Sequence, residues 1–102
     1  MGISQTVRDF RASVEDRFPT PTVEDSYLFL VSEMGEVADA YVRMRGAKYA
    51  RNADRAGDRD ALRKEIGQTL LMLTTFAEHF DIDMDDALRA AMQGILARAR
   101  DE

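Results

Sequence analysis

The segment YLFLVSEMGEVADAYVRM, residues 27–44, decides the fold class of this chain of 102 residues. Its apolar side chains surround most of a helix, and a helix of that kind is normally central and covered on several sides. Thr22, with Asp25 three residues later, resembles a capping box, so we expect the helix to begin there. It should run to about Arg45 and stop at Gly46.

Three further segments have the apolar spacing of amphipathic helices. Ser4 is a suitable cap for the first, and the prolines in residues 19–21 end it. Asp58 is a suitable cap for the third, and residues 81–83 separate it from the fourth. No segment alternates as a strand would. The sequence therefore predicts an all-α, four-helix bundle-like fold in a single domain over residues 1–102.

Composition narrows the class of protein and its partners. The net charge of −5 argues against non-specific binding of nucleic acid. No apolar run reaches the roughly 20 residues of a membrane span, and no secretory signal is visible, so we expect a cytoplasmic protein without a membrane partner. Because the first and fourth helices cannot cover all the apolar surface of the other two, we expect a homo-oligomer.

A short motif occurs twice, 32 residues apart, as EMGE at residues 33–36 and EIGQ at residues 65–68. Residues three apart share one face of a helix, so each copy projects two oxygen-bearing side chains in one direction. Glu33 and Glu65 fall at the same edge of the apolar arc on their helices. Each mid-helix glycine costs roughly 1 kcal/mol relative to alanine, which indicates close backbone approach or room for a ligand.

Four oxygen donors that converge between two helices favour a hard cation, Mg²⁺ or Mn²⁺, over zinc. The predicted ligands are Glu33, Glu36, Glu65 and Gln68, with Asp39 one turn further as a reserve. The sole histidine, His79, is expected at the surface or at the rim of a pocket rather than on a metal. Acidic residues at a plain helix–helix boundary remain the structural alternative.

Basic residues accompany this acidic motif. Eight of the 14 lysines and arginines fall in the window 43–64, between and beside the two copies. An acidic metal pocket beside a basic loop suits a metal-chelated polyphosphate, although a solvated loop explains the same charges. The chain has no cysteine and no Ser-His-Asp set, so the nucleophile of an enzyme of this kind would be water.

At these residues the chain resembles the all-α nucleoside-triphosphate pyrophosphohydrolases of the MazG-like superfamily. The pattern of that family is Glu-x-x-Glu, a spacer, and Glu-x-x-Asp on two helices. Residues 30–42 and 62–73 match its two motif helices, and residues 80–87 match its turn into the last helix. The motif-bearing part covers about residues 22–100.

The resemblance implies a reaction and a site. Glu33, Glu36 and Glu65 would hold Mg²⁺ on a nucleoside triphosphate, and water would release a nucleoside monophosphate and pyrophosphate, in a housecleaning role for the nucleotide pool. Members are homodimers or dimer-of-dimers tetramers whose sites form where protomers meet. The basic residues expected to face phosphate are Lys48, Arg51, Lys64 and Arg98, and the aromatic residues able to stack on a base are Phe10, Phe29 and Tyr49.

Gln68 departs from the family pattern, which has aspartate at this position. Glutamine keeps an acceptor oxygen but lacks the charge, so one Mg²⁺ can still bind while a second is weakened. Phosphoribosyl-ATP pyrophosphohydrolases share the fold, and some of their sequences resemble this chain in having glutamine here, so this class of histidine-pathway enzyme is one alternative. A non-catalytic bundle that binds a nucleotide or a partner through a degenerate site is another.

Overall fold

The computed structural model describes residues 2–45 and 55–101, and the side chains of the second range from residue 59 onward. Lys48 and Arg51, predicted to face phosphate, and Tyr49, predicted to stack on a base, lie outside the described residues.

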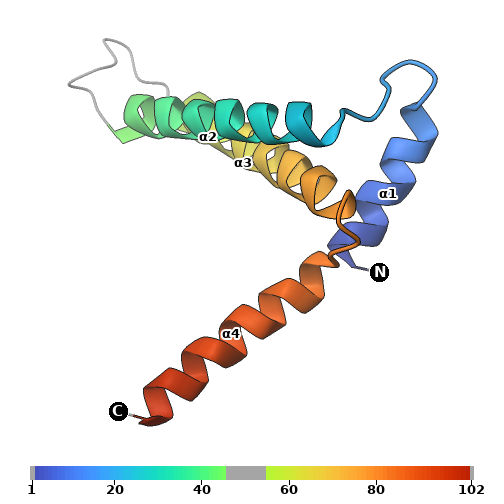
Figure 1. Ribbon diagram of the computed structural model, residues 1–102. Helices are drawn as coiled ribbons and strands as arrows, with labels where there is room; N and C mark the ends of the chain where they lie inside the picture. The colour runs from blue at the N-terminus through green and yellow to red at the C-terminus, as the bar shows by residue number, and fades with distance from the viewer. Residues whose placement is uncertain (1, 46–54, 102) are drawn as a thin grey trace. The chain divides into compact units, whose positions relative to one another are not determined.

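Four helices account for most of the described chain (Figure 1). They are α1 (Ile3–Val14), α2 (Val23–Arg45), α3 (Arg55–Glu78) and α4 (Met84–Asp101). Residues 2–45 and 55–101 contain no strand, which confirms the all-α prediction. None of the helices in these ranges is long and apolar enough to cross a membrane.

The helices α2 and α4 begin where the sequence predicts, and α1 and α3 begin earlier. The Thr22 hydroxyl accepts a hydrogen bond from the Asp25 amide at 3.2 Å, which caps α2. The Asp83 carboxylate caps α4 in the same way, accepting from the Asp86 amide at 3.1 Å. The helix α3 starts at Arg55, so the prediction that Asp58 caps it was wrong, since Asp58 already lies within the helix.

The starts of α1 and α4 cap each other. The prediction that Ser4 caps α1 was wrong, because α1 begins at Ile3 and the residue in the capping position is Gly2. The Asp85 carboxylate instead accepts a hydrogen bond from the Ile3 amide at 3.1 Å. The Ser4 hydroxyl, which is fully buried, accepts one from the Met84 amide at 2.8 Å. Each helix thus supplies the acceptor that the other helix lacks at its first turn.

The predicted break between α3 and α4 has the geometry of a Schellman turn. Asp81 adopts the left-handed conformation with φ of 55°. The Ile82 amide donates to the Ala77 carbonyl oxygen, and the Asp81 amide donates to that of Glu78, both at 3.1 Å. These bonds satisfy carbonyl groups at the end of α3 and reverse the chain toward α4.

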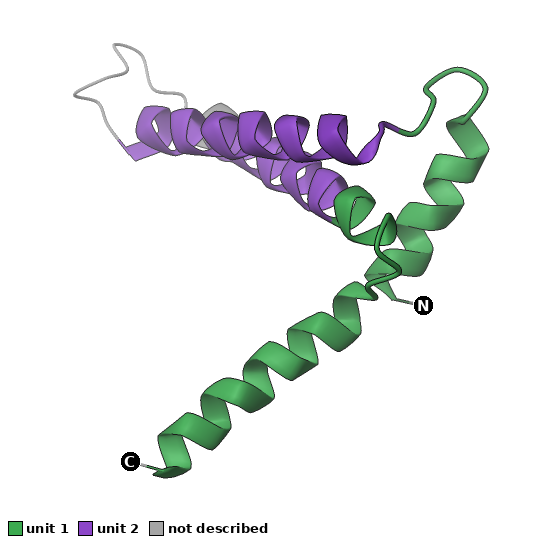
Figure 2. Cartoon of the chain, in the orientation of Figure 1, with its two compact units in different colours: residues 1–20, 74–102 green, residues 21–73 purple. Residues whose placement is uncertain are grey.

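The chain divides into two compact units, residues 1–20 with 74–102 and residues 21–73 (Figure 2). The buried side chains of the first unit are Ser4, Val7, Thr74, Thr75 and Ala77, and those of the second are Ser26, Leu30, Ala40 and Met72. Most are small or polar, whereas many large apolar side chains remain exposed. The assignment of residues 1–102 to one domain stays a prediction.

Replacement of Ser4 by alanine should destabilise the fold by about 1 kcal/mol, because the Met84 amide loses its acceptor in a buried place. Thermal and urea unfolding measure the change. Ser13→Ala is the matched control on the same helix, since the Ser13 hydroxyl is exposed and bonds only the nearby Phe10 carbonyl. Equal losses in the two variants would contradict the assigned role of Ser4.

Candidate metal and phosphate site

The unit of residues 21–73 contains both copies of the repeated motif and brings three of their polar side chains together. The Gln68 amide lies between Glu33 of α2 and Glu65 of α3. Hydrogen bonding assigns its inward atom as nitrogen, which donates to Glu33 Oε2 at 3.0 Å and to Glu65 Oε2 at 3.2 Å. The predicted convergence of the two helices at this motif is therefore present for these three residues.

Helical spacing explains why these side chains face each other. On α2, Glu33 shares a side with Leu30 and Ala40, which are buried. On α3, Glu65 and Gln68 share a side with buried Met72. All three polar side chains are consequently half-buried at the contact between the two helices. Their position costs desolvation, which hydrogen bonding partly offsets.

The surroundings of Glu33 favour its neutral form. Burial raises the pKa of the Glu33 carboxyl above its ordinary value of 4.5, and a hydrogen bond with Glu65 raises it further. The negative charges of Glu65 and Glu36 act in the same direction, whereas the positive charge of Lys64 lowers the pKa of Glu33. Burial and the nearby carboxyl groups therefore favour the protonated form of Glu33.

The second members of the two motif copies differ in position. Gln68 is half-buried between the two glutamates, whereas Glu36 is exposed on α2 and acts on Glu33 through its charge. Asp39, the predicted reserve ligand, is exposed and accepts a hydrogen bond from Arg43 Nη1 at 2.6 Å. The repeat is thus symmetric in sequence but not in side-chain arrangement.

The two motif glycines face open space. A methyl group built on Gly35 or Gly67 would meet no atom within 4 Å outside its own helix turn and neighbours. Close approach between α2 and α3 therefore does not require either glycine in the described chain. The other explanation that the sequence allows, room for a ligand, stays a prediction.

Basic side chains line two shallow pockets on α3, directly beside the second motif. One, of about 370 Å³, is lined by Asp60, Arg63, Lys64 and Gly67. The other, of about 390 Å³, is lined by Arg59, Asp60, Leu62, Arg63 and Ile66. Lys64 was expected from the sequence, but Arg59 and Arg63 were not singled out. Arg63 precedes Gly67 by four residues, a helical spacing that indicates a shared face.

The residues that converge fit Mg²⁺ as a donor set. Mg²⁺ is commonly held by one or two carboxylates with substrate phosphates and water as its other ligands. Glu33 and Glu65 supply two carboxylates, and Gln68 has an amide oxygen. Among the described residues, no three acidic, histidine or cysteine side chains are grouped to hold a metal, and Glu36 is exposed on α2.

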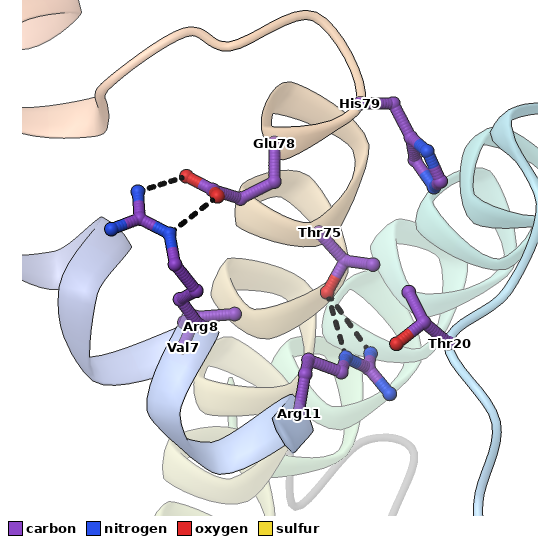
Figure 3. A pocket seen from close by; sticks show the side chains of 7 residues that line it. All are labelled: Val7, Arg8, Arg11, Thr20, Thr75, Glu78 and His79. Carbon is purple, nitrogen blue, oxygen red and sulfur yellow. Dashed lines mark hydrogen bonds and ion pairs between the residues drawn. The ribbon is translucent and has the colours of Figure 1, made fainter. Parts of the chain in front are cut away.

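A separate pocket of about 210 Å³ lies in the other unit (Figure 3). Arg8 and Glu78 form a two-bond ion pair at its edge, with 3.0 and 3.1 Å between nitrogen and oxygen. Arg11 donates to the buried Thr75 hydroxyl, and burial lowers the pKa of this guanidinium. His79 is exposed on the pocket wall, as expected from the sequence.

Arg98, the fourth residue predicted to face phosphate, is exposed in the last turn of α4. It belongs to the unit that lacks the two motifs. Its role in phosphate binding stays a prediction.

The sequence matches the MazG nucleotide pyrophosphohydrolase domain over residues 22–101. This match covers most of the chain, including both motif copies and α4. The chain belongs to the MazG nucleotide pyrophosphohydrolase family, a family of hydrolases. No curated protein and no solved structure gave a significant match.

The raised pKa of Glu33 makes the stability of the metal-free protein depend on pH. A carboxyl group whose folded pKa is raised contributes full stability below its unfolded pKa, and that contribution is lost as pH rises through the folded pKa. From pH 4.5 upward, Glu33→Gln should therefore lose less stability than the wild type, and near neutral pH it should melt a few degrees higher.

Thermal unfolding in the presence of a chelator, repeated from pH 4 to pH 8 in steps of about half a unit, measures this difference. Glu24→Gln, an exposed position in the first turn of the same helix, provides the matched control. Parallel pH profiles for the wild type and Glu33→Gln would contradict the raised pKa of Glu33.

Proposed function

We propose that the protein is a Mg²⁺-dependent nucleoside-triphosphate pyrophosphohydrolase. It would cleave the bond between the α and β phosphates with water, releasing a nucleoside monophosphate and pyrophosphate, in support of nucleotide-pool housecleaning. The observation that carries the proposal is the half-buried group of Glu33, Glu65 and Gln68 beside basic pockets. It lies within a domain matched to a family of this general activity.

In this proposal two sets of side chains have different tasks. Glu33, Glu36 and Glu65 would hold the cation, with the Gln68 amide oxygen as a neutral fourth ligand. Bound Mg²⁺ would supply positive charge that polarises the phosphoryl group and activates water. Lys64 and Arg63, which line the pocket beside Gly67, would bind the phosphate oxygens.

The hydrolysis itself needs a proton acceptor but no protein nucleophile. Water attacks the α phosphorus, the bond to the bridging oxygen breaks, and pyrophosphate leaves with the bond electrons. A carboxylate has two oxygens, so exposed Glu36, whose charge acts on Glu33, would bind the cation through one of them and take the proton from water through the other. Its side chain is not occupied by the hydrogen bonds that hold Gln68 to the other two glutamates.

The purified protein should release pyrophosphate from at least one nucleoside triphosphate in the presence of Mg²⁺ or Mn²⁺. Glu36→Ala and Glu65→Ala should lower kcat/KM by roughly 100-fold or more while the helical circular dichroism signal is retained. Glu24→Ala, on the exposed first turn of α2, should leave turnover unchanged. A coupled pyrophosphate assay over ribo- and deoxynucleotides measures these rates.

The same panel decides between the alternatives. Preferential turnover of phosphoribosyl-ATP would show that the protein is a phosphoribosyl-ATP pyrophosphohydrolase rather than an enzyme for ordinary nucleoside triphosphates. If no nucleotide in the panel reacts with either metal, while nucleotide binding is still measured by calorimetry, the chain is a non-catalytic binding bundle and the proposal is wrong.

We further propose that a second copy of the chain covers an apolar stripe on α2. Four of its large side chains are about half-exposed, Tyr27 at 52%, Val31 at 51%, Met34 at 56% and Tyr41 at 47%. With exposed Ala38 they repeat at alternating steps of four and three residues, the spacing of a helix–helix seam. A continuous exposed apolar stripe of this kind marks an interaction surface. Homodimers or dimer-of-dimers tetramers would bury it.

Introduction of a charge into this stripe should dissociate the oligomer. Met34→Glu places a carboxylate within the seam, whereas Ser32→Glu places one on the polar side of the same helix, near Asp39. Light scattering coupled to size exclusion should give a mass near the 11.5 kDa monomer for the first variant and an oligomer for the second. A monomeric wild-type protein at micromolar concentration would rule out this surface as a stable interface.

A further inference from the structure

The Gln68 amide occupies the place between Glu33 and Glu65 where a cation would neutralise them. Its nitrogen donates to both carboxylates, at 3.0 and 3.2 Å. An ionised carboxylate only accepts hydrogen bonds, so a second acceptor in this place would be repelled. The NH₂ group supplies the two donors that the glutamates need when no cation is present.

The oxygen of the same amide suits the state in which a cation is bound. A carboxamide has its two donors on nitrogen and its acceptor lone pairs on oxygen. The final torsion of a glutamine side chain is broad and roughly two-fold, so the two ends exchange by a half-turn with little steric cost. With the oxygen inward, Gln68 presents the type of donor atom that Mg²⁺ binds.

We propose that Gln68 holds Glu33 and Glu65 together when no cation is bound, an inference that rests on the proposed function. When a divalent cation binds, the amide of Gln68 turns and binds it through oxygen. The side chain is a positioning residue without the cation and a ligand with it. This role requires an amide, because both ends of the group are used.

The inference predicts what a carboxylate at this position would change. Aspartate or glutamate offers only acceptors, so the empty site would hold three clustered carboxylates with no donor between them. Such a site depends on the cation for stability. The natural glutamine gives a site that is stable when empty, and cation binding must first break two hydrogen bonds. Compared with a carboxylate at position 68, glutamine therefore lowers the affinity for the cation and raises the stability of the metal-free fold.

Side-chain amide NMR tests the two orientations directly. The chain has four carboxamides, Gln5, Asn52, Gln68 and Gln93, so its NH₂ signals are few, and those absent from Gln68→Met identify Gln68. In a chelator, the Gln68 NH₂ protons should exchange with water about tenfold slower than those of exposed Gln93. Saturating Mg²⁺ should shift the Gln68 signals and remove this protection, while the Gln93 signals stay in place.

Unfolding of variants provides the second readout. In a chelator near neutral pH, Gln68→Met should melt below the wild type because the bridge is lost, and Gln68→Glu should melt lower still because a third charge is added. Mg²⁺ should raise the midpoint of Gln68→Glu more than that of the wild type. Gln93→Glu, on the exposed surface of α4, controls for the added charge.

The outcomes separate this inference from the proposed function. The hydrogen bonds from Gln68 to Glu33 and Glu65 are ruled out by either of two results, whatever the enzyme assay shows. One is fast exchange of the Gln68 NH₂ protons in a chelator, and the other is equal metal-free midpoints for the wild type and Gln68→Glu. Calorimetric binding of Mg²⁺ with unchanged Gln68 signals overturns the turn of the amide but leaves the hydrolase intact. If calorimetry shows no Mg²⁺ binding, both the Mg²⁺ dependence of the proposed function and the rotation of the Gln68 amide are wrong.

Discussion

Two carboxyl groups that meet at the contact of two helices have to be neutralised. Glu33 of α2 and Glu65 of α3 are both half-buried, so water cannot fully screen their charges. Three features of the second unit reduce the repulsion between the two glutamates: the Gln68 amide between their carboxyl groups, the raised pKa of Glu33, and the positive charge of Lys64. A protein that needed only a stable helix pair would place leucine at these positions. Under the proposed function, the pair is retained because it would hold a cation.

Three sides of the helix α2 face different environments. One side packs within its unit through Leu30 and Ala40 and carries Glu33 into the acidic group. A second side bears the exposed stripe that includes Tyr27 and Met34. The remaining side is polar and includes Asp39 with its ion pair to Arg43. The weak separation of apolar and polar residues along this helix reflects these three demands rather than a poor amphipathic pattern.

Sequence patterns predicted the helices and the meeting of the two motifs, because helical spacing fixes which residues share the apolar side of each helix. The cap of α2 at Thr22 and the chain reversal at Asp81 are likewise short-range features. The role of Ser4 could not be predicted, since its partner Met84 is 80 residues away in the chain. Spacing also places Glu36 and Gln68 equivalently, and only side-chain packing shows that one is exposed while the other bridges two carboxylates.

The reciprocal caps at the starts of α1 and α4 have a consequence for how the first unit opens. The Ile3 amide depends on Asp85, and the Met84 amide depends on Ser4, so fraying of either helix removes an acceptor from the other. A methyl group on Gly2 would collide with Asp85 Oδ2, so a larger residue there would displace the oxygen that accepts from the Ile3 amide. The two helix ends therefore form one cooperative unit, in which hydrogen exchange at the first turn of α1 and at that of α4 occurs through a shared opening event.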